Sequence, residues 1–175
     1  MTRHTLRIAV CTLLAFPALA QAHPGHDAGL SFAAGALHPL AGIDHLFALL
    51  AVGLLAARMG GRATIAIPAA FLTLLGAGLA IGYAGVQLVF MEAAILVSIL
   101  VCALLALAPP RRLPVATSAL VGVFALFHGN VHGCEAAAGI GREPYASGLM
   151  MTSAFVICLT TLTMRTRSWA WRPNY

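Results

Sequence analysis

Long runs of apolar residues are the feature that most constrains the fold of this chain. A helix needs about 20 mainly apolar residues to cross a bilayer, because each residue advances it by about 1.5 Å. Apolar residues make up 61% of the sequence and charged residues 9%, too few to cover the surface of a soluble domain. We therefore predict an all-α, polytopic membrane protein with a bundle of about five transmembrane helices. The segments long enough to cross, the last only just, are 30–57, 63–84, 86–108, 114–135 and 146–164.

The first 22 residues are typical of a secretory signal peptide. Arg3 and Arg7 give a basic start, an apolar core follows, and the small residues "AQA" at 20–22 form a cleavage site. The core is shorter than a membrane span and contains Pro17, so we expect cleavage rather than an uncleaved first helix. The expected organisation is a signal peptide over 1–22 and one transmembrane domain over 23–175.

The arginines predict the orientation in the membrane. With five crossings, the first and third connections and the C-terminal tail lie on one side, and the positive-inside rule makes that side cytoplasmic. The N-terminus is then periplasmic, in agreement with a signal peptide, and the expected location is the bacterial inner membrane. The arginines on the cytoplasmic side are Arg58, Arg62, Arg111, Arg112, Arg165, Arg167 and Arg172.

The net charge of +5 does not indicate a nucleic-acid partner. The arginines stand singly or in pairs between apolar runs, where they do not form the basic patch that binds nucleic acid. The lipid bilayer is the partner that this charge pattern predicts, and the sequence leaves the oligomeric state open.

Polar residues inside the apolar segments are the best candidates for a functional site. A charged side chain at mid-bilayer costs about 2.5–3.5 kcal/mol even on the lenient insertion scale, so such residues are rare and usually functional. Segments one and three run inward and segment four outward, so these groups can converge on a site open to the periplasm. The residues are His38, Asp44 and His45 in segment one, Glu92 in segment three, and His128, His132 and Glu135 in segment four.

The stretch "FHGNVHGCE", residues 127–135, carries three of these groups on one helix face. At 100° per residue, His128, His132 and Glu135 fall within roughly 60° of one another. Cys134 points about 100° or more away and is not counted as a ligand. In "HPLAGIDH", residues 38–45, the proline and glycine suit a helix start or a local break. If that segment is one helix, its two histidines share a face.

Imidazole and carboxylate groups together form a ligand set for Ni²⁺, Co²⁺ or Zn²⁺. The stretch "HPLAGIDHLFALLAVGLL" resembles the HPxxGxDHxL signature of the HupE/UreJ family of nickel and cobalt permeases, and "FHGNVHGCE" resembles that family's second histidine motif. The resemblance covers essentially the whole chain. It implies uptake of Ni²⁺, or of Co²⁺, to supply hydrogenase or urease and their maturation proteins. Residues 23–175 then form a metal-permease domain that transports its ion and holds no permanent cofactor.

The resemblance also implies which residues are functional. Phe71 in segment two matches the family and is expected to act as a gate or a wall of the pathway. The polar residues implied by the resemblance are His38, Asp44, His45, Glu92, His132 and Glu135.

Several interpretations stay open beside a permease. The polar groups can form a structural clasp between helices, and the H-x3-H-x2-E motif can hold zinc in an intramembrane hydrolase with Asp44 or Glu92 as general base. A metal sensor or chaperone is a third class. After cleavage, His23 and His26 can capture metal at the N-terminus. The ligand types suit nickel and cobalt alike, and both proton coupling and facilitated diffusion are compatible with them.

Overall fold

The computed structural model describes residues 30–107, 114–136 and 141–170, and every regular element in these ranges is an α-helix. The all-α prediction is confirmed. The predicted signal peptide, its cleavage site, His23 and His26 lie outside the described residues. The helices are α2 (Phe32–Ala41), α3 (Ile43–Met59), α4 (Ala63–Tyr83), α5 (Met91–Leu107), α6 (Pro114–Ala136) and α7 (Arg142–Ala170).

The described helices match the predicted membrane segments, with two differences. Three helices are long and apolar enough to cross a membrane: α4, α6 and Arg142–Arg165 of α7. Helices α2 and α3 together form a broken span bent by 79°, which brings the number to as many as four. Helix α5 is also apolar and has 17 residues, the lower end of the range for a crossing. The first segment is therefore broken rather than continuous.

The second difference is the start of α5. The third segment, expected from residue 86, becomes helical only at Met91. In the loop before Met91, backbone groups of residues 86 and 88 form hydrogen bonds with a side chain of α6 in place of the hydrogen bonds of a helix. The Asn130 amide accepts a hydrogen bond from the backbone N–H of Leu88 and donates one to the carbonyl oxygen of Val86, both at 2.8 Å. The loop before α5 is therefore attached to α6.

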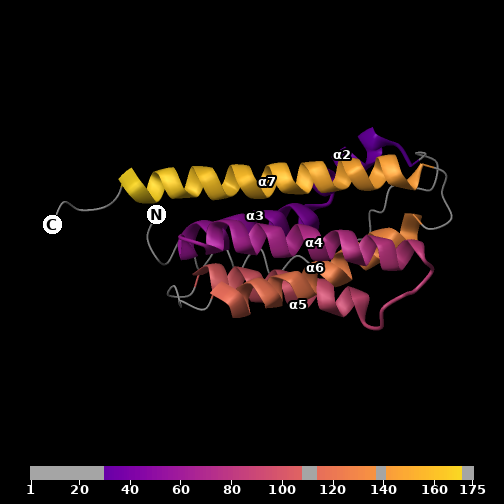
Figure 1. Cartoon of the computed structure of the whole chain (residues 1–175), viewed down its shortest axis with the longest axis horizontal. Helices are drawn as coiled ribbons and strands as arrows, with labels where there is room; N and C mark the ends of the chain where they lie inside the picture. The colour runs from indigo at the N-terminus through magenta and orange to yellow at the C-terminus, as the bar shows by residue number, and fades with distance from the viewer. Residues whose placement is uncertain (1–29, 108–113, 137–140, 171–175) are drawn as a thin grey trace.

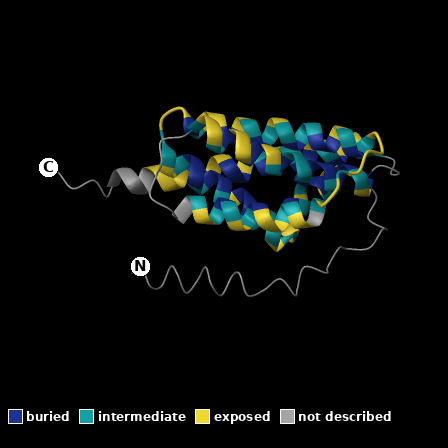
Figure 2. Cartoon of the chain, turned by 90° about the horizontal axis from the view of Figure 1, so that it is seen from below, coloured by how far each residue is buried: buried dark blue, intermediate teal, exposed yellow. Residues whose placement is uncertain are grey.

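Helices α3 to α7 lie along the long axis of the bundle, and α2 lies at one end (Figure 1). There α2 packs against the first turns of α7, through contacts of Gly35 with Tyr145 and of Gly148 with Phe32. Buried residues lie between the helices, and exposed ones lie on the outside (Figure 2). Large apolar side chains such as Ile65 (75% exposed) point outward, as expected for a surface that faces lipid.

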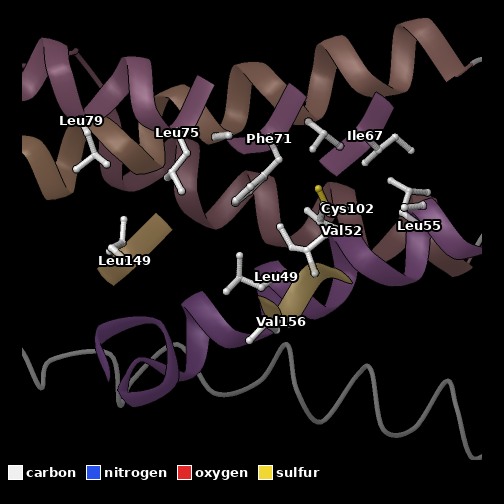
Figure 3. Packing of buried hydrophobic residues seen from close by; sticks show 14 of the residues in the cluster. Leu49, Val52, Leu55, Ile67, Phe71, Leu75, Leu79, Cys102, Leu149 and Val156 are labelled. Atoms are coloured by element: carbon white, nitrogen blue, oxygen red, sulfur yellow. The ribbon is translucent and has the colours of Figure 1, made fainter. Parts of the chain in front are cut away.

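Close contact between α4 and α6 forms the firmest part of the bundle. A Cβ atom at Gly78 would overlap the carbonyl oxygen of Leu126, and one at Gly129 would overlap that of Leu75. Glycine is needed at both places because the two backbones touch, as small residues allow in membrane helices. Beside this contact, Phe71 and Leu75 of α4 pack with residues of α3 and α5 in the apolar core (Figure 3).

Two glycines of α4 give a matched test of this contact. We expect Gly78→Ala to destabilise the protein by about 1–3 kcal/mol, because the methyl group would force the helices apart. Gly76→Ala should be neutral or slightly stabilising, since its nearest neighbour would be Met150 Cε at 3.7 Å and alanine favours a helix. Thermal unfolding of both variants in detergent measures the difference. Equal melting temperatures would contradict the packing described here.

Candidate metal centre

The break between α2 and α3 shapes the first part of the site. Ser31 caps α2 by accepting a hydrogen bond from Ala34 N, and α2 ends where Gly42 adopts an extended backbone conformation. A Cβ atom at Gly42 would lie 2.6 Å from His45 Nδ1 and 3.1 Å from Asp44 Oδ1. The side chains of Asp44 and His45 thus occupy the space that a larger residue would need. Glycine at this position lets the first turn of α3 fold over the bend.

Three imidazoles meet at this bend. They come from the end of α2 (His38), the start of α3 (His45) and the last two turns of α6 (His132). One ligand atom from each lies within 4.8 Å of the others, and their ring centroids are 4.6 to 5.0 Å apart. We call these three residues the histidine triad. The predicted convergence of the two histidine motifs is therefore observed, although His38 and His45 meet through the bend and not on one helix face.

The shortest contact in the triad is between His45 Nε2 and His132 Nε2, at 2.9 Å. A hydrogen bond between two such nitrogens needs one proton, carried by one ring and accepted by the other. A metal ion binds the lone pairs of imidazole nitrogens, so it would take the place of that proton. The contact therefore marks the point at which an ion and a proton compete.

Two carboxylates lie behind the triad. Asp44 Oδ1 is 3.0 Å from His45 Nδ1, and Glu135 Oε2 is 3.5 Å from His132 Nδ1. Each carboxylate approaches the Nδ1 side of a ring whose Nε2 faces the other ring. The Asp44–His45 hydrogen bond is the contact by which a carboxylate orients a metal-binding histidine and makes it a better ligand, and Glu135 lies at ion-pair distance from His132. Both carboxylates are predicted as ligands from the sequence, and this geometry favours an orienting role for them.

His128 lies one helical turn before His132 on α6 and stands apart from the triad. Its side chain is 5% exposed, and its ring meets that of His45 edge-on at 4.7 Å. His128, His45 and His132 line a narrow cavity of about 10 Å³, roughly the space of one water molecule. Phe71 of α4 and Ser153 of α7 line the same cavity. Phe71 therefore lies beside the histidines, and its role as a gate or wall of a pathway stays a prediction.

The remaining predicted residues lie as follows. Glu92 falls in the first turn of α5, and its side chain is outside the described part of the structure. Cys134 Sγ lies 3.7 Å from Val86 O and 3.9 Å from Asn130 Oδ1, so it faces the α4–α5 loop. It points away from the triad, as the helical spacing predicts.

Two residues near the site were missed by the sequence analysis. Tyr145 of α7 is buried, and its ring packs edge-on against that of His38, with the ring centroids 5.9 Å apart. Asn130 lies between the two α6 histidines in the sequence, is fully buried, and forms hydrogen bonds with the α4–α5 loop. Its place inside "FHGNVHGCE" was a signal, because a buried amide in an apolar helix needs polar partners.

Fold and site together define a multi-pass helical membrane protein with a partly buried imidazole cluster near one end of its bundle. The family model described as HupE / UreJ protein matches residues 11–173, so the chain belongs to the HupE/UreJ family. Protein HupE of Rhizobium leguminosarum bv. viciae is 35% identical over 144 residues, which cover 82% of this chain and 74% of that protein. No solved structure matches the chain. The family resemblance noted from the two motifs is confirmed.

The orienting role of Asp44 can be separated from direct ligation. We expect Asp44→Ala to weaken Ni²⁺ binding about 10–100-fold, the usual cost of losing such a partner. Asp44→Asn should weaken it less, because the amide oxygen can still accept a hydrogen bond from His45 Nδ1. Isothermal titration calorimetry on the purified protein measures both, with Glu143→Gln, an exposed carboxylate of α7, as control. Equal losses in the two Asp44 variants would identify Asp44 as a ligand.

Proposed function

We propose that this protein is a permease that carries Ni²⁺, with Co²⁺ as the closest competitor, across the bacterial inner membrane into the cytoplasm. The observation that carries the proposal is the histidine triad, whose ligand atoms from α2, α3 and α6 lie within 4.8 Å inside a bundle of membrane helices. Membership of the HupE/UreJ family supports it. The ion is cargo, and no permanently bound cofactor or enzymatic activity is part of the proposal.

The donor atoms determine which ions suit the triad. Imidazole nitrogen is a good ligand for Ni²⁺, Co²⁺ and Zn²⁺, whereas Mg²⁺ and Ca²⁺ prefer oxygen. Two imidazole nitrogens about 2.1 Å from one ion and at right angles to each other lie about 3 Å apart. The 2.9 Å between His45 Nε2 and His132 Nε2 is close to that spacing. A small movement of either ring would widen the nitrogen–nitrogen distance to the value of a tetrahedral site. The pair therefore suits an ion of either coordination geometry.

Exposure suggests how an ion reaches the triad. The side chains of Asp44 and Glu135 are 35% and 39% exposed, while that of His132 is 2% exposed. A hydrated cation would meet the carboxylates first and exchange water for imidazole further in. In the proposed orientation this end of the bundle is periplasmic, and Arg58 and Arg62 mark the cytoplasmic end.

A metal ion and a proton compete for the same ring nitrogens. The proton between His45 Nε2 and His132 Nε2 must leave that position when a metal ion binds there, and it passes either to the Nδ1 of His132 or to solvent. Release to solvent would couple transport to protons, and we include that coupling in the proposal. Inside the cell, the ion would be delivered to the maturation proteins of hydrogenase or urease.

An intramembrane zinc hydrolase is the main rival. Three histidines and an open position are also typical of catalytic zinc. In the H-x3-H-x2-E motif of α6, however, His128 lies outside the triad and Glu135 lies against His132. The motif alone therefore does not close around one ion. A hydrolase would also retain zinc through purification, whereas a permease must release its cargo.

Uptake of radioactive nickel by cells that lack their own nickel transporters tests the function. We expect the wild-type chain to raise accumulation above that of cells with an empty vector, and His132→Ala to abolish the rise. Cys134→Ala is the matched control, because it lies on the same helix but faces the α4–α5 loop. Unlabelled Co²⁺ and Zn²⁺ as competitors rank the ions. If wild type accumulates no more Ni²⁺, Co²⁺ or Zn²⁺ than empty cells, the permease function is wrong.

A further inference from the structure

His128 is a buried imidazole that the triad does not use. Its side chain is 5% exposed, and its ring contacts are with His45 at 4.7 Å and His132 at 5.6 Å. Burying a polar ring costs free energy, so the place of His128 beside two other imidazoles calls for an explanation.

The cavity beside His128 supplies one. His128 lines it together with His45 and His132, and Phe71 and Ser153 lie on the other sides. The cavity has room for one water-sized group, and it brings together an imidazole and a buried hydroxyl. The rest of the lining is mostly apolar, so the imidazoles and the Ser153 hydroxyl are the groups that would hold a small cation or a water molecule there.

In the proposed orientation, the cavity lies on the inward side of the triad. His128 is a turn nearer than His132 to the start of α6, and Phe71 lies in the half of α4 that begins at Ala63. Both residues therefore lie nearer than His132 to the end of the bundle that carries Arg58 and Arg62. An ion leaving the triad for the cytoplasm would therefore meet His128 next.

We propose that His128 forms a second, transient ion position, which takes Ni²⁺ from the triad before the ion passes Phe71. The proposal rests on the permease function and deepens it. Three imidazoles release a transition-metal ion slowly when all the bonds must break together. A fourth imidazole next to His45 and His132 lets the ion exchange ligands one at a time. Passage needs such weaker, successive sites, because an ion held too tightly does not leave.

The proposal predicts that loss of His128 affects the rate of transport but not the affinity for the ion. The triad binds the ion at equilibrium, so loss of His128 should leave affinity almost unchanged. The same loss should slow the hand-over and hence the turnover. A packing role for His128 would show a different pattern, because an aromatic ring of similar size would then restore transport.

The test compares His128→Ala, His128→Phe and His132→Ala with wild type, in two assays. Nickel binding is measured by calorimetry on purified protein, and the maximal uptake rate by radioactive nickel in cells at matched expression. Val121→Ala on the same helix is the control for lost buried volume, since Val121 is fully buried but is not part of the site. Size-exclusion profiles verify that each variant is folded.

We expect both His128 variants to bind Ni²⁺ within about 3-fold of wild type and to lose at least about 10-fold in uptake rate, while His132→Ala loses both. Unchanged uptake in His128→Ala, restored uptake in His128→Phe, or loss of binding as severe as in His132→Ala would each overturn the second position and leave the permease function standing. Absence of uptake by wild type would overturn both.

Discussion

The contact between His45 and His132 is the interaction on which the arrangement of the site depends. The two residues are 87 positions apart, and their Nε2 atoms lie 2.9 Å from each other. In a bilayer no water replaces a missing partner, so polar side chains must meet one another across helices. A single interhelical hydrogen bond contributes only about 0.6–1.7 kcal/mol, so the contact cannot assemble the bundle by itself. Packing has to place it.

Two local features of the chain provide that placement. The extended backbone at Gly42 turns α2 away from α3 by 79° and leaves room for Asp44 and His45 at the bend. On the other side, glycines of α4 and α6 allow backbone contact, which fixes the height of His132 in the bundle. His132 is therefore placed by helices in close contact, whereas His38 and His45 lie on either side of a bend whose backbone is outside the helical pattern.

Much of this arrangement is predictable from the sequence, because the bilayer imposes strong and simple requirements. Segment length predicts the helices, and the cost of burying the histidines predicts their convergence. The pattern allows a break near Gly42 but does not choose it, since tertiary packing makes that bend. Nor can spacing show that Asp44 and Glu135 lie on the Nδ1 side of their histidines, because that depends on side-chain rotation. The late start of α5 depends on Asn130, which binds backbone atoms far along the chain, and no short-range pattern encodes such contacts.

Charge explains why carboxylates and imidazoles occur together in the proposed site. A bare divalent ion in a low-dielectric interior would be prohibitively costly, and neutral imidazoles alone do not remove its charge. Asp44 and Glu135 carry two negative charges at 3.0 and 3.5 Å from the rings, so they can balance the ion through the histidines that bind it. A site built this way offsets much of the charge of the ion, and it avoids the anionic ligands that would hold the cargo most tightly.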